Sequence, residues 1–225
     1  MAITKRILIR IPVYKRIELL HFIIAYLDKQ IEMYNSTIKG NNFDFVVVTV
    51  DEEDPIIKMK NAPTYHVYQP NTNLGEKLDK SMREIINDFE FDFLLELGSD
   101  DTIHFKAFAE YNHQILKDHH VFGFNHLFVR KIDSVNPLNI TDQMAVKYPQ
   151  VIGAGRMISR EAIEKVYAGG YNLWDHHIHE GNDMNAQKNL EKVGYDTHCI
   201  DGLYITDYKS DMNIQSYEKL KKWVV

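Results

Sequence analysis

The sequence predicts an α/β fold with a Rossmann-like, mainly parallel central sheet flanked by helices. Short, almost continuously apolar runs, typical of strands buried on both faces, alternate with longer runs in which apolar residues recur every three or four positions. In the first half, these runs follow the order strand, helix, strand, strand, helix, strand, which is typical of parallel sheets with helical crossovers. The order is less regular after residue 101, so a mixed second half is expected.

The first half contains the clearest patterns. Strands are expected over residues 6–12, 43–54, 64–70 and 91–97, and the first of them is stopped by a proline. A first amphipathic helix is expected from Ile17 to Tyr34, where apolar residues keep the helical spacing, and a second from Leu74 to Phe89. Each expected helix therefore directly follows a strand or its turn.

The second half is expected to continue with alternating helices and strands. Helices are expected over residues 105–116 and 160–168, in a segment ending at Gly194, and over 214–224. Strands are expected over residues 121–130 and 151–159, and a strand or hairpin over 197–206. Residues 131–149 show no clear period and contain two prolines, so they are expected to form a functional loop or lid.

Composition excludes several classes of function. The chain has 225 residues, 44% of them hydrophobic, which suits one sizeable domain. A formal charge of −6 argues against a nucleic-acid binder and against a polybasic membrane surface. The single cysteine, the absence of a signal-like segment and the absence of about 20 consecutive apolar residues favour a cytoplasmic protein without a membrane span, in the host cytoplasm if it is viral.

Polar residues gather where the expected strands end. They are the segments 12–16 (PVYKR), 51–54 (DEED) and 99–101 (SDD). Ligands of open α/β sheets bind beyond the carboxyl ends of strands, and a planar aromatic, cations and carboxylates suit a nucleotide diphosphate with Mg²⁺ or Mn²⁺. The pair Asp100 and Asp101 could equally serve only to cap a helix. No P-loop and no G-x-G-x-x-G motif competes with this site.

A second polar stretch, WDHHIHEGNDMNAQKNLEKVGY, covers residues 174–195. Its histidines do not form H-E-x-x-H and no cysteine accompanies them, so a polar loop is favoured over a zinc site. Asp183 opens the following helix on its inward face, where the helix dipole would keep a carboxylate ionised. Asp183 is therefore a candidate general base, although an aspartate here could also only stabilise its own helix.

Seven motifs follow one another along the chain: IPVYKR (11–16), VTVDEED (48–54), NTNLGEKLDKS (71–81), LGSDD (97–101), GAGRMISREAIEKV (153–166), GND (181–183) and ITDYKS (205–210). Together they resemble the inverting GT-A-type glycosyltransferases of family two, particularly the short bacterial and viral members. The resemblance extends from residue 7 to about residue 210. It implies a single GT-A domain over 1–225, with a nucleotide-binding half (1–101) and an acceptor-binding half (102–225).

The resemblance also implies roles for individual residues. Donor contacts are expected from Pro12, Tyr14, Arg16, Asp51, Glu52, Lys77, Lys80 and Asp100, with the two lysines on one helix face near the diphosphate. Mn²⁺ or Mg²⁺ is expected on Asp101, Asp100 and Asp207, with Asp101 at an exposed strand end. Acceptor contacts are expected from Trp174, as a stacking platform, and from Asp175 and Glu180. Asp183, 11 residues before Gly194, would be the base.

The expected function is metal-dependent, inverting transfer of a sugar from a nucleotide-diphosphate donor to an acceptor hydroxyl, such as that of a glycan. The chain departs from the family pattern at Gly98, in place of the leading Asp of D-x-D, and at Asn182, in place of a Glu. These departures leave open an inactive carbohydrate- or nucleotide-binding protein of the same fold. A sugar-1-phosphate nucleotidyltransferase is also considered, but PVYKR lacks the glycine-rich loop of that class.

Overall fold

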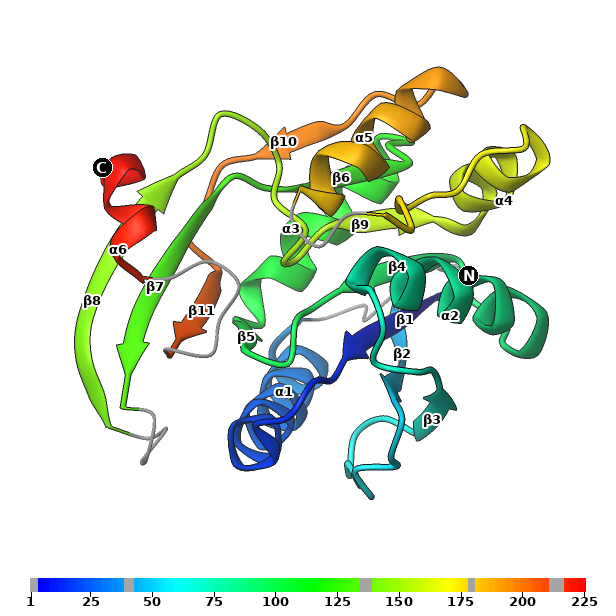
Figure 1. Cartoon of the computed structure of the whole chain (residues 1–225). Helices are drawn as coiled ribbons and strands as arrows, with labels where there is room; N and C mark the ends of the chain where they lie inside the picture. The colour runs from blue at the N-terminus through cyan, green and yellow to red at the C-terminus, as the bar shows by residue number, and fades with distance from the viewer. Residues whose placement is uncertain (1–3, 39–42, 134–138, 178–180, 211–216) are drawn as a thin grey trace.

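The computed structural model describes residues 4–38, 43–133, 139–177, 181–210 and 217–225. Within these ranges the strands form a seven-stranded sheet, in the order β10-β6-β9-β4-β1-β2-β3, and a four-stranded sheet, in the order β5-β11-β7-β8. Figure 1 places β7, β8 and β11 together at the left and the larger sheet, with its helices, at the right. Among the described residues, no helix combines the length and the apolar character that a bilayer crossing requires.

The first half of the chain builds the parallel part of the large sheet. Its strands are β1 (Lys5–Pro12), β2 (Phe43–Asp51), β3 (Thr64–Tyr68) and β4 (Phe93–Glu96), all mutually parallel where they pair. The crossovers include α1 (Ile17–Thr37) and α2 (Leu74–Asp88). Every element predicted in this half is confirmed. Pro12 pairs with Val50 in register, so β1 and β2 end side by side.

The second half completes the same sheet in mixed orientation. Strand β9 (Met157–Ser159) lies antiparallel between β4 and β6 (Val121–Phe124), and β10 (His198–Ile200) is parallel to β6 at the edge. The helices of this half include α3 (Lys106–Leu116), α4 (Arg160–Ala168) and α5 (Asn182–Lys192). The mixed second half is thus confirmed.

The small sheet joins segments that are distant in sequence. Strand β11 (Ile205–Lys209) lies between β5 (Asp101–Ile103), to which it is antiparallel, and β7 (His126–Ile132), to which it is parallel. Strand β8 (Ile140–Lys147) is the outer strand. The chain ends in α6 (Tyr217–Leu220) and a 3₁₀ turn (Lys221–Trp223), beside the small sheet in Figure 1.

Four sequence expectations need correction. The expected strand 121–130 is two strands that belong to different sheets, and the expected loop 131–149 contains β8, paired along its length with β7. Most β8 side chains are exposed or half-buried, so the strand lacks the apolar pattern by which strands are recognised. Only 157–159 of the expected strand 151–159 is a strand. Of the expected terminal helix, the described residues form α6 (Tyr217–Leu220) followed by a 3₁₀ turn, and residues 211–216 lie outside the described ranges.

Two apolar layers cover the large sheet. The side chains of β1 alternate between them: Ile7, Ile9 and Ile11 belong to the layer that includes α1 and α3 residues, and Leu8 to the layer that includes α2, α4 and α5 residues. This alternation is the two-residue period of a strand buried on both faces. Arg10, the next residue on the Leu8 side, is 1% exposed, so a full charge lies inside the second layer.

Candidate functional site

Three carboxylates meet where the two sheets join. Asp100 and Asp101 follow β4, and Asp207 lies opposite Asp101 in the β5–β11 register. These three aspartates, here called the acidic triad, each offer one oxygen within 4.8 Å of the others. Two cations touch the triad: Lys209 Nζ lies 2.6 Å from Asp207 and 3.9 Å from Asp100, and Arg16 Nη1 lies 3.4 Å from Asp100.

The triad is electrostatically strained. Burial, with the neighbouring charges of Asp207 and Asp100, raises the pKa of Asp101 well above its usual range. Burial also raises the pKa of Asp207 to about 6, although Lys209 acts in the opposite direction. For Lys209, burial is more than offset by Asp207 and Asp100, so the pKa of its ammonium is raised. Crowded buried carboxylates of this kind favour a further cation.

Glycine at position 98 leaves room for the triad. A Cβ on Gly98 would lie 2.7 Å from Oδ1 of Asp100 and 2.7 Å from Oδ2 of Asp101, so the two carboxylates occupy the space that a side chain at this position would need. The Gly98 amide donates to Asp101 Oδ2 at 2.7 Å. Asp101 was expected at an exposed strand end. It is instead 6% exposed, because it opens β5 and is paired with β11.

The triad fits a divalent metal. Its ligands are all carboxylate oxygens, the donors that Mg²⁺ and Mn²⁺ prefer. Buried Asp207 Oδ1 has no hydrogen-bond partner among the described residues, although buried polar atoms are normally paired. An unpaired carboxylate oxygen inside a cluster of carboxylates is an available ligand position.

Several of the expected donor residues lie at the ends of β1 and β2. Tyr14, two residues beyond the end of β1 at Pro12, is 53% exposed, as a stacking surface must be. Asp51 ends β2 and accepts a hydrogen bond from the side-chain Nδ2 of Asn71 at 2.6 Å. The carboxylate of the exposed Glu52 accepts one from the backbone N–H of Asn71, also at 2.6 Å. Asn71 therefore fixes both acids at this edge of the sheet.

The two expected phosphate lysines have different positions. Lys77 is 4% exposed, and its ammonium donates to the carbonyl of Val13, to Asn71 Oδ1 and, at 3.2 Å, to Asp51. Burial lowers the pKa of Lys77, against the opposing effect of Asp51. An ammonium has three protons, and all three have acceptors inside the protein. Lys77 therefore ties α2 to the ends of β1 and β2, and the expected phosphate contact is not supported.

Lys80 does not share the position of Lys77. Its side chain is 54% exposed, and its ammonium pairs with Glu76 at 2.6 Å along α2. The two lysines thus do not share an exposed face, because α2 packs Lys77 against the strand ends and leaves Lys80 at the solvent. A contact between Lys80 and a diphosphate stays a prediction.

Asp183 lies in the first turn of α5, as predicted, and its carboxylate is held from two sides. Oδ2 accepts from the Gly153 amide at 2.8 Å, and Oδ1 lies 3.1 Å from Arg156 Nη2. Arg156 Nη1 also donates to the Asp183 carbonyl at 3.0 Å. A Cβ on Gly153 would lie 2.2 Å from Asp183 Oδ1, so only glycine allows this approach. The Asp183 side chain remains 47% exposed and can be reached by a ligand.

A buried chain of charges stands behind Asp183. Arg156 Nε lies 3.4 Å from Glu96 Oε2, and Glu96 Oε1 lies 3.2 Å from Arg10 Nη2. Arg10 and Glu96 are register partners on β1 and β4. Burial raises the pKa of Glu96, against the opposing effects of Arg156 and Arg10. Sequence reasoning missed this network, although its signal was present: a charged residue at the buried position of each of two apolar strands.

Trp174 requires a further correction. It is 0% exposed, and Arg10 lies 4.1 Å from the centre of its ring, so it packs in the core and cannot offer a sugar a stacking face. Buried Asp79 of α2 holds this segment by accepting from the Leu173 amide at 2.7 Å and lying 3.1 Å from His176 Nε2. The tryptophan is thus anchored inward from both sides.

Asp175 and Glu180 are the other two expected acceptor residues, and only Asp175 lies within the described residues. The Asp175 carboxylate is half-buried and accepts from the His177 amide at 2.9 Å, a local turn contact. Glu180 lies outside the described residues. Gly75 packs closely against this segment, because a Cβ there would lie 1.8 Å from the Asp175 carbonyl oxygen.

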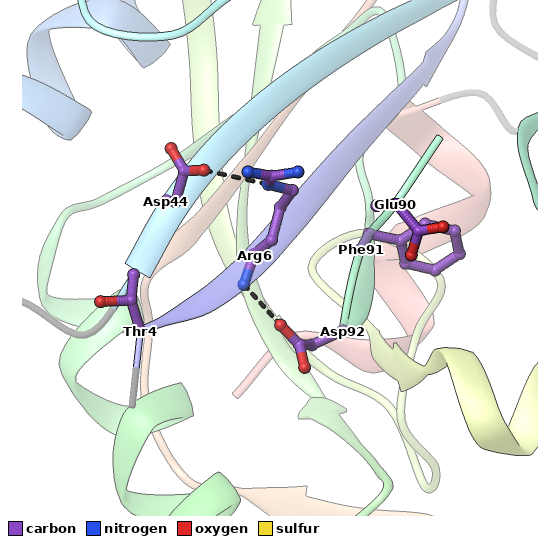
Figure 2. A pocket seen from close by; sticks show the side chains of 6 residues that line it. All are labelled: Thr4, Arg6, Asp44, Glu90, Phe91 and Asp92. Atoms are coloured by element: carbon purple, nitrogen blue, oxygen red, sulfur yellow. Dashed lines mark hydrogen bonds and ion pairs between the residues drawn. The ribbon is translucent and has the colours of Figure 1, made fainter. Parts of the chain in front are cut away.

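Figure 2 shows a separate hollow at the amino ends of β1, β2 and β4, lined by Thr4, Arg6, Asp44, Glu90, Phe91 and Asp92. There, Arg6 pairs with Asp44 at 3.0 Å, and its amide donates to Asp92 at 2.8 Å. The triad and Asp183 do not line this hollow. Because ligands of α/β sheets bind at the carboxyl ends of strands, it is not the candidate site.

Comparisons with known proteins give a likeness in structure. No family model matches the sequence, and no curated protein matches it. The fold is similar to a crystal structure of S. aureus TarS 1–349, with a TM-score of 0.52 and 16% identity over 90% of this chain. A longer S. aureus TarS structure matches with a TM-score of 0.53 and 15% identity over 91% of the chain. TarS is a GT-A-type glycosyltransferase.

The chain has a GT-A fold. The predicted fold class is therefore confirmed, while the particular family stays a prediction. The chain spans 60% of the length of the shorter TarS structure and 37% of the longer one.

Within this GT-A fold, the charges of the triad and of Asp183 both affect the pKa of Tyr148. Burial raises the pKa of Tyr148 to about 12, and the carboxylates of Asp207, Asp183 and Asp101 act in the same direction, against the opposing effect of Lys209. Tyr148 is thus linked electrostatically to the triad and to Asp183. Sequence reasoning missed this residue because it falls in the segment expected to be a loop.

Proposed function

We propose that the chain is a metal-dependent glycosyltransferase that moves a sugar from a nucleotide-diphosphate donor to an acceptor hydroxyl, such as that of a glycan, with inversion. The observation that carries this proposal is the acidic triad in a GT-A fold, at the end of the sheet where ligands bind. Asp183 supports the proposal, because its side chain is half-exposed and its charge, like those of Asp101 and Asp207, raises the pKa of Tyr148.

The donor would bind across the ends of β1, β2 and β4. The exposed Tyr14 suits stacking on the base, and Asp51 and Glu52 suit contacts to base or ribose N–H and O–H groups. Asp100, Asp101 and Asp207 would hold Mn²⁺ or Mg²⁺, which when bound neutralises charge on the leaving diphosphate. Arg16, beside Asp100, provides a further cation near the same place.

Asp183 would accept the proton of the acceptor hydroxyl. A hydroxyl is a poor nucleophile at neutral pH, and a positioned base raises its reactivity by about 10²–10⁴-fold. The Gly153 amide and Arg156 fix the carboxylate in one orientation, while about half of its surface stays open. One base on the acceptor side favours direct displacement at the anomeric carbon, and hence inversion. Asp175 and Glu180 are proposed to lie near the acceptor.

A panel of nucleotide sugars and nucleoside diphosphates, scored by thermal shift with and without Mn²⁺, tests donor binding. A ligand at 100 times its dissociation constant stabilises a protein by about 2.7 kcal/mol. We expect one nucleotide series to stabilise the chain in a Mn²⁺-dependent way, and Asp101→Asn to remove the Mn²⁺ dependence. Shifts for no member of the panel, or equal shifts in Asp101→Asn, would refute the donor site.

One alternative function has its own supporting observation. Both oxygens of Asp183 already have protein partners, and Lys209 already pairs with the triad, as would suit a catalytically inactive carbohydrate- or nucleotide-binding protein. Release of free nucleoside diphosphate from the stabilising nucleotide sugar separates the two. Binding without any Mn²⁺-dependent turnover, in the presence of a range of acceptors, would favour the inactive protein.

A further inference from the structure

We propose that Lys209 is a built-in counter-ion of the acidic triad, and that a divalent cation must displace its ammonium from Asp207 in order to bind. This inference rests on the proposed metal site and adds a residue that sets the affinity of that site. Among the described residues, the Lys209 ammonium is the cation closest to the triad.

The geometry places the ammonium among the atoms that would ligate the metal. Lys209 Nζ lies 2.6 Å from Oδ2 of Asp207 and 3.9 Å from Oδ2 of Asp100. The Lys209 side chain is 13% exposed, so its charge is poorly screened by solvent. The other oxygen of Asp207 has no hydrogen-bond partner among the described residues, so Asp207 presents one occupied and one open position.

The position of Lys209 follows from strand geometry. Asp207 and Lys209 are two residues apart on β11, and side chains two apart on a strand project from the same face. The pairing of β11 with β5 then brings that face against Asp101. The ammonium is therefore delivered by the strand that also delivers the third carboxylate.

Competition follows from charge. A divalent ion bound between the three carboxylates would lie within a few ångströms of the ammonium, where like charges repel strongly in a partly buried site. Either the ammonium moves away or the metal binds weakly. Removing the charge at position 209 should therefore strengthen metal binding, although Lys209 is not itself a metal ligand.

The test is the affinity of the metal-free chain for Mn²⁺, measured from the electron paramagnetic resonance signal of free Mn²⁺ in a titration. Lys209→Met should bind Mn²⁺ at least about tenfold more tightly than wild type. Lys209→Arg keeps the charge and should stay close to wild type. Lys131→Met is the matched control. Lys131 is the register partner of Lys209 on the neighbouring strand β7, but its Nζ lies 4.0 Å from the Glu218 carboxylate instead of at the triad.

The outcomes separate this inference from the proposed function. If wild type and Lys209→Met bind Mn²⁺ with equal affinity and Asp101→Asn does not bind it, the role of Lys209 is overturned and the metal site stays intact. The same gain in Lys131→Met as in Lys209→Met would also overturn it, by assigning the effect to net charge. Absence of Mn²⁺ binding in all variants, or binding that survives in Asp101→Asn, would overturn the metal site together with this inference. If Lys209→Met does not fold, Lys209→Gln, which also lacks the charge, takes its place. It should bind Mn²⁺ more tightly than wild type, and an unchanged affinity would refute the role of Lys209.

Discussion

Glu96 offers the sharpest test of the buried network behind Asp183. Glu96→Gln keeps the shape of the side chain but removes the negative charge that lies between Arg10, at 3.2 Å, and Arg156, at 3.4 Å. Both arginines are 1% exposed, so they cannot regain water without opening the core. The variant should therefore leave buried positive charge without its carboxylate.

The size of the effect follows from burial. Removing one member of a buried ion pair costs about 3–5 kcal/mol, because the remaining charge stays desolvated. For a chain of this length, 1 kcal/mol lowers the melting temperature by about 2–4 °C, so Glu96→Gln should lower it by roughly 6–20 °C. The matched control is Glu164→Gln, which breaks the pair that Arg160 forms with the half-exposed Glu164 at 2.7 Å. That surface pair should contribute at most about 0.5 kcal/mol.

The assay is thermal unfolding followed by circular dichroism at neutral pH, supported by urea unfolding to give the free energy. Burial raises the pKa of Glu96, and a carboxyl already protonated at neutral pH would make the glutamine substitution nearly silent. A melting temperature of Glu96→Gln within about 2 °C of wild type would therefore refute the charged network.

Three further predictions follow. Asp183→Asn should retain donor binding in the thermal-shift assay while sugar transfer falls by about 10²–10⁴-fold in steady-state kinetics, and full activity would move the base elsewhere. Because the pKa of Asp207 is raised to about 6 from its usual 3.8, its contribution to the stability of the metal-free protein is present below about pH 4 and lost as the pH rises through about 6. Asp207→Asn should therefore gain on wild type between those pH values, on the order of 2–3 kcal/mol in urea unfolding, and a constant difference would refute this. Lys77→Met should lower the stability, by about 1–3 kcal/mol in the same assay, because it leaves buried acceptors unpaired; a loss of diphosphate binding at unchanged stability would restore the phosphate role.

Local patterns in the sequence were enough to predict the parallel half of the fold. The alternation of apolar strands and amphipathic helices predicted β1, α1, β2, β3, α2 and β4 in order, because hydrophobic periodicity is imposed by burial within each element. The same patterns placed Tyr14, Asp51 and Asp100 at strand ends, and so at one edge of the sheet. They also placed Asp183 in the first turn of its helix.

The fate of individual side chains was decided by packing. Trp174 and Lys77 are residue types often found at the surface of a ligand site, yet both are buried, because Arg10 and the strand ends provide partners that are remote in sequence. Arg10 and Glu96 became a network only through the register of β1 with β4. No local pattern carries information about such partners.

By itself, the sequence determined the order of the elements in the first half of the chain and which polar residues stand at their ends. The tertiary structure alone decided that β11 returns beside β5, so that Asp207 faces Asp101 and Lys209 comes with it. It also decided that the segment expected to be a loop supplies β8 and Tyr148. The physical reason is that periodicity reports only whether a face is buried, whereas strand pairing across the chain is selected by the packing of the whole molecule.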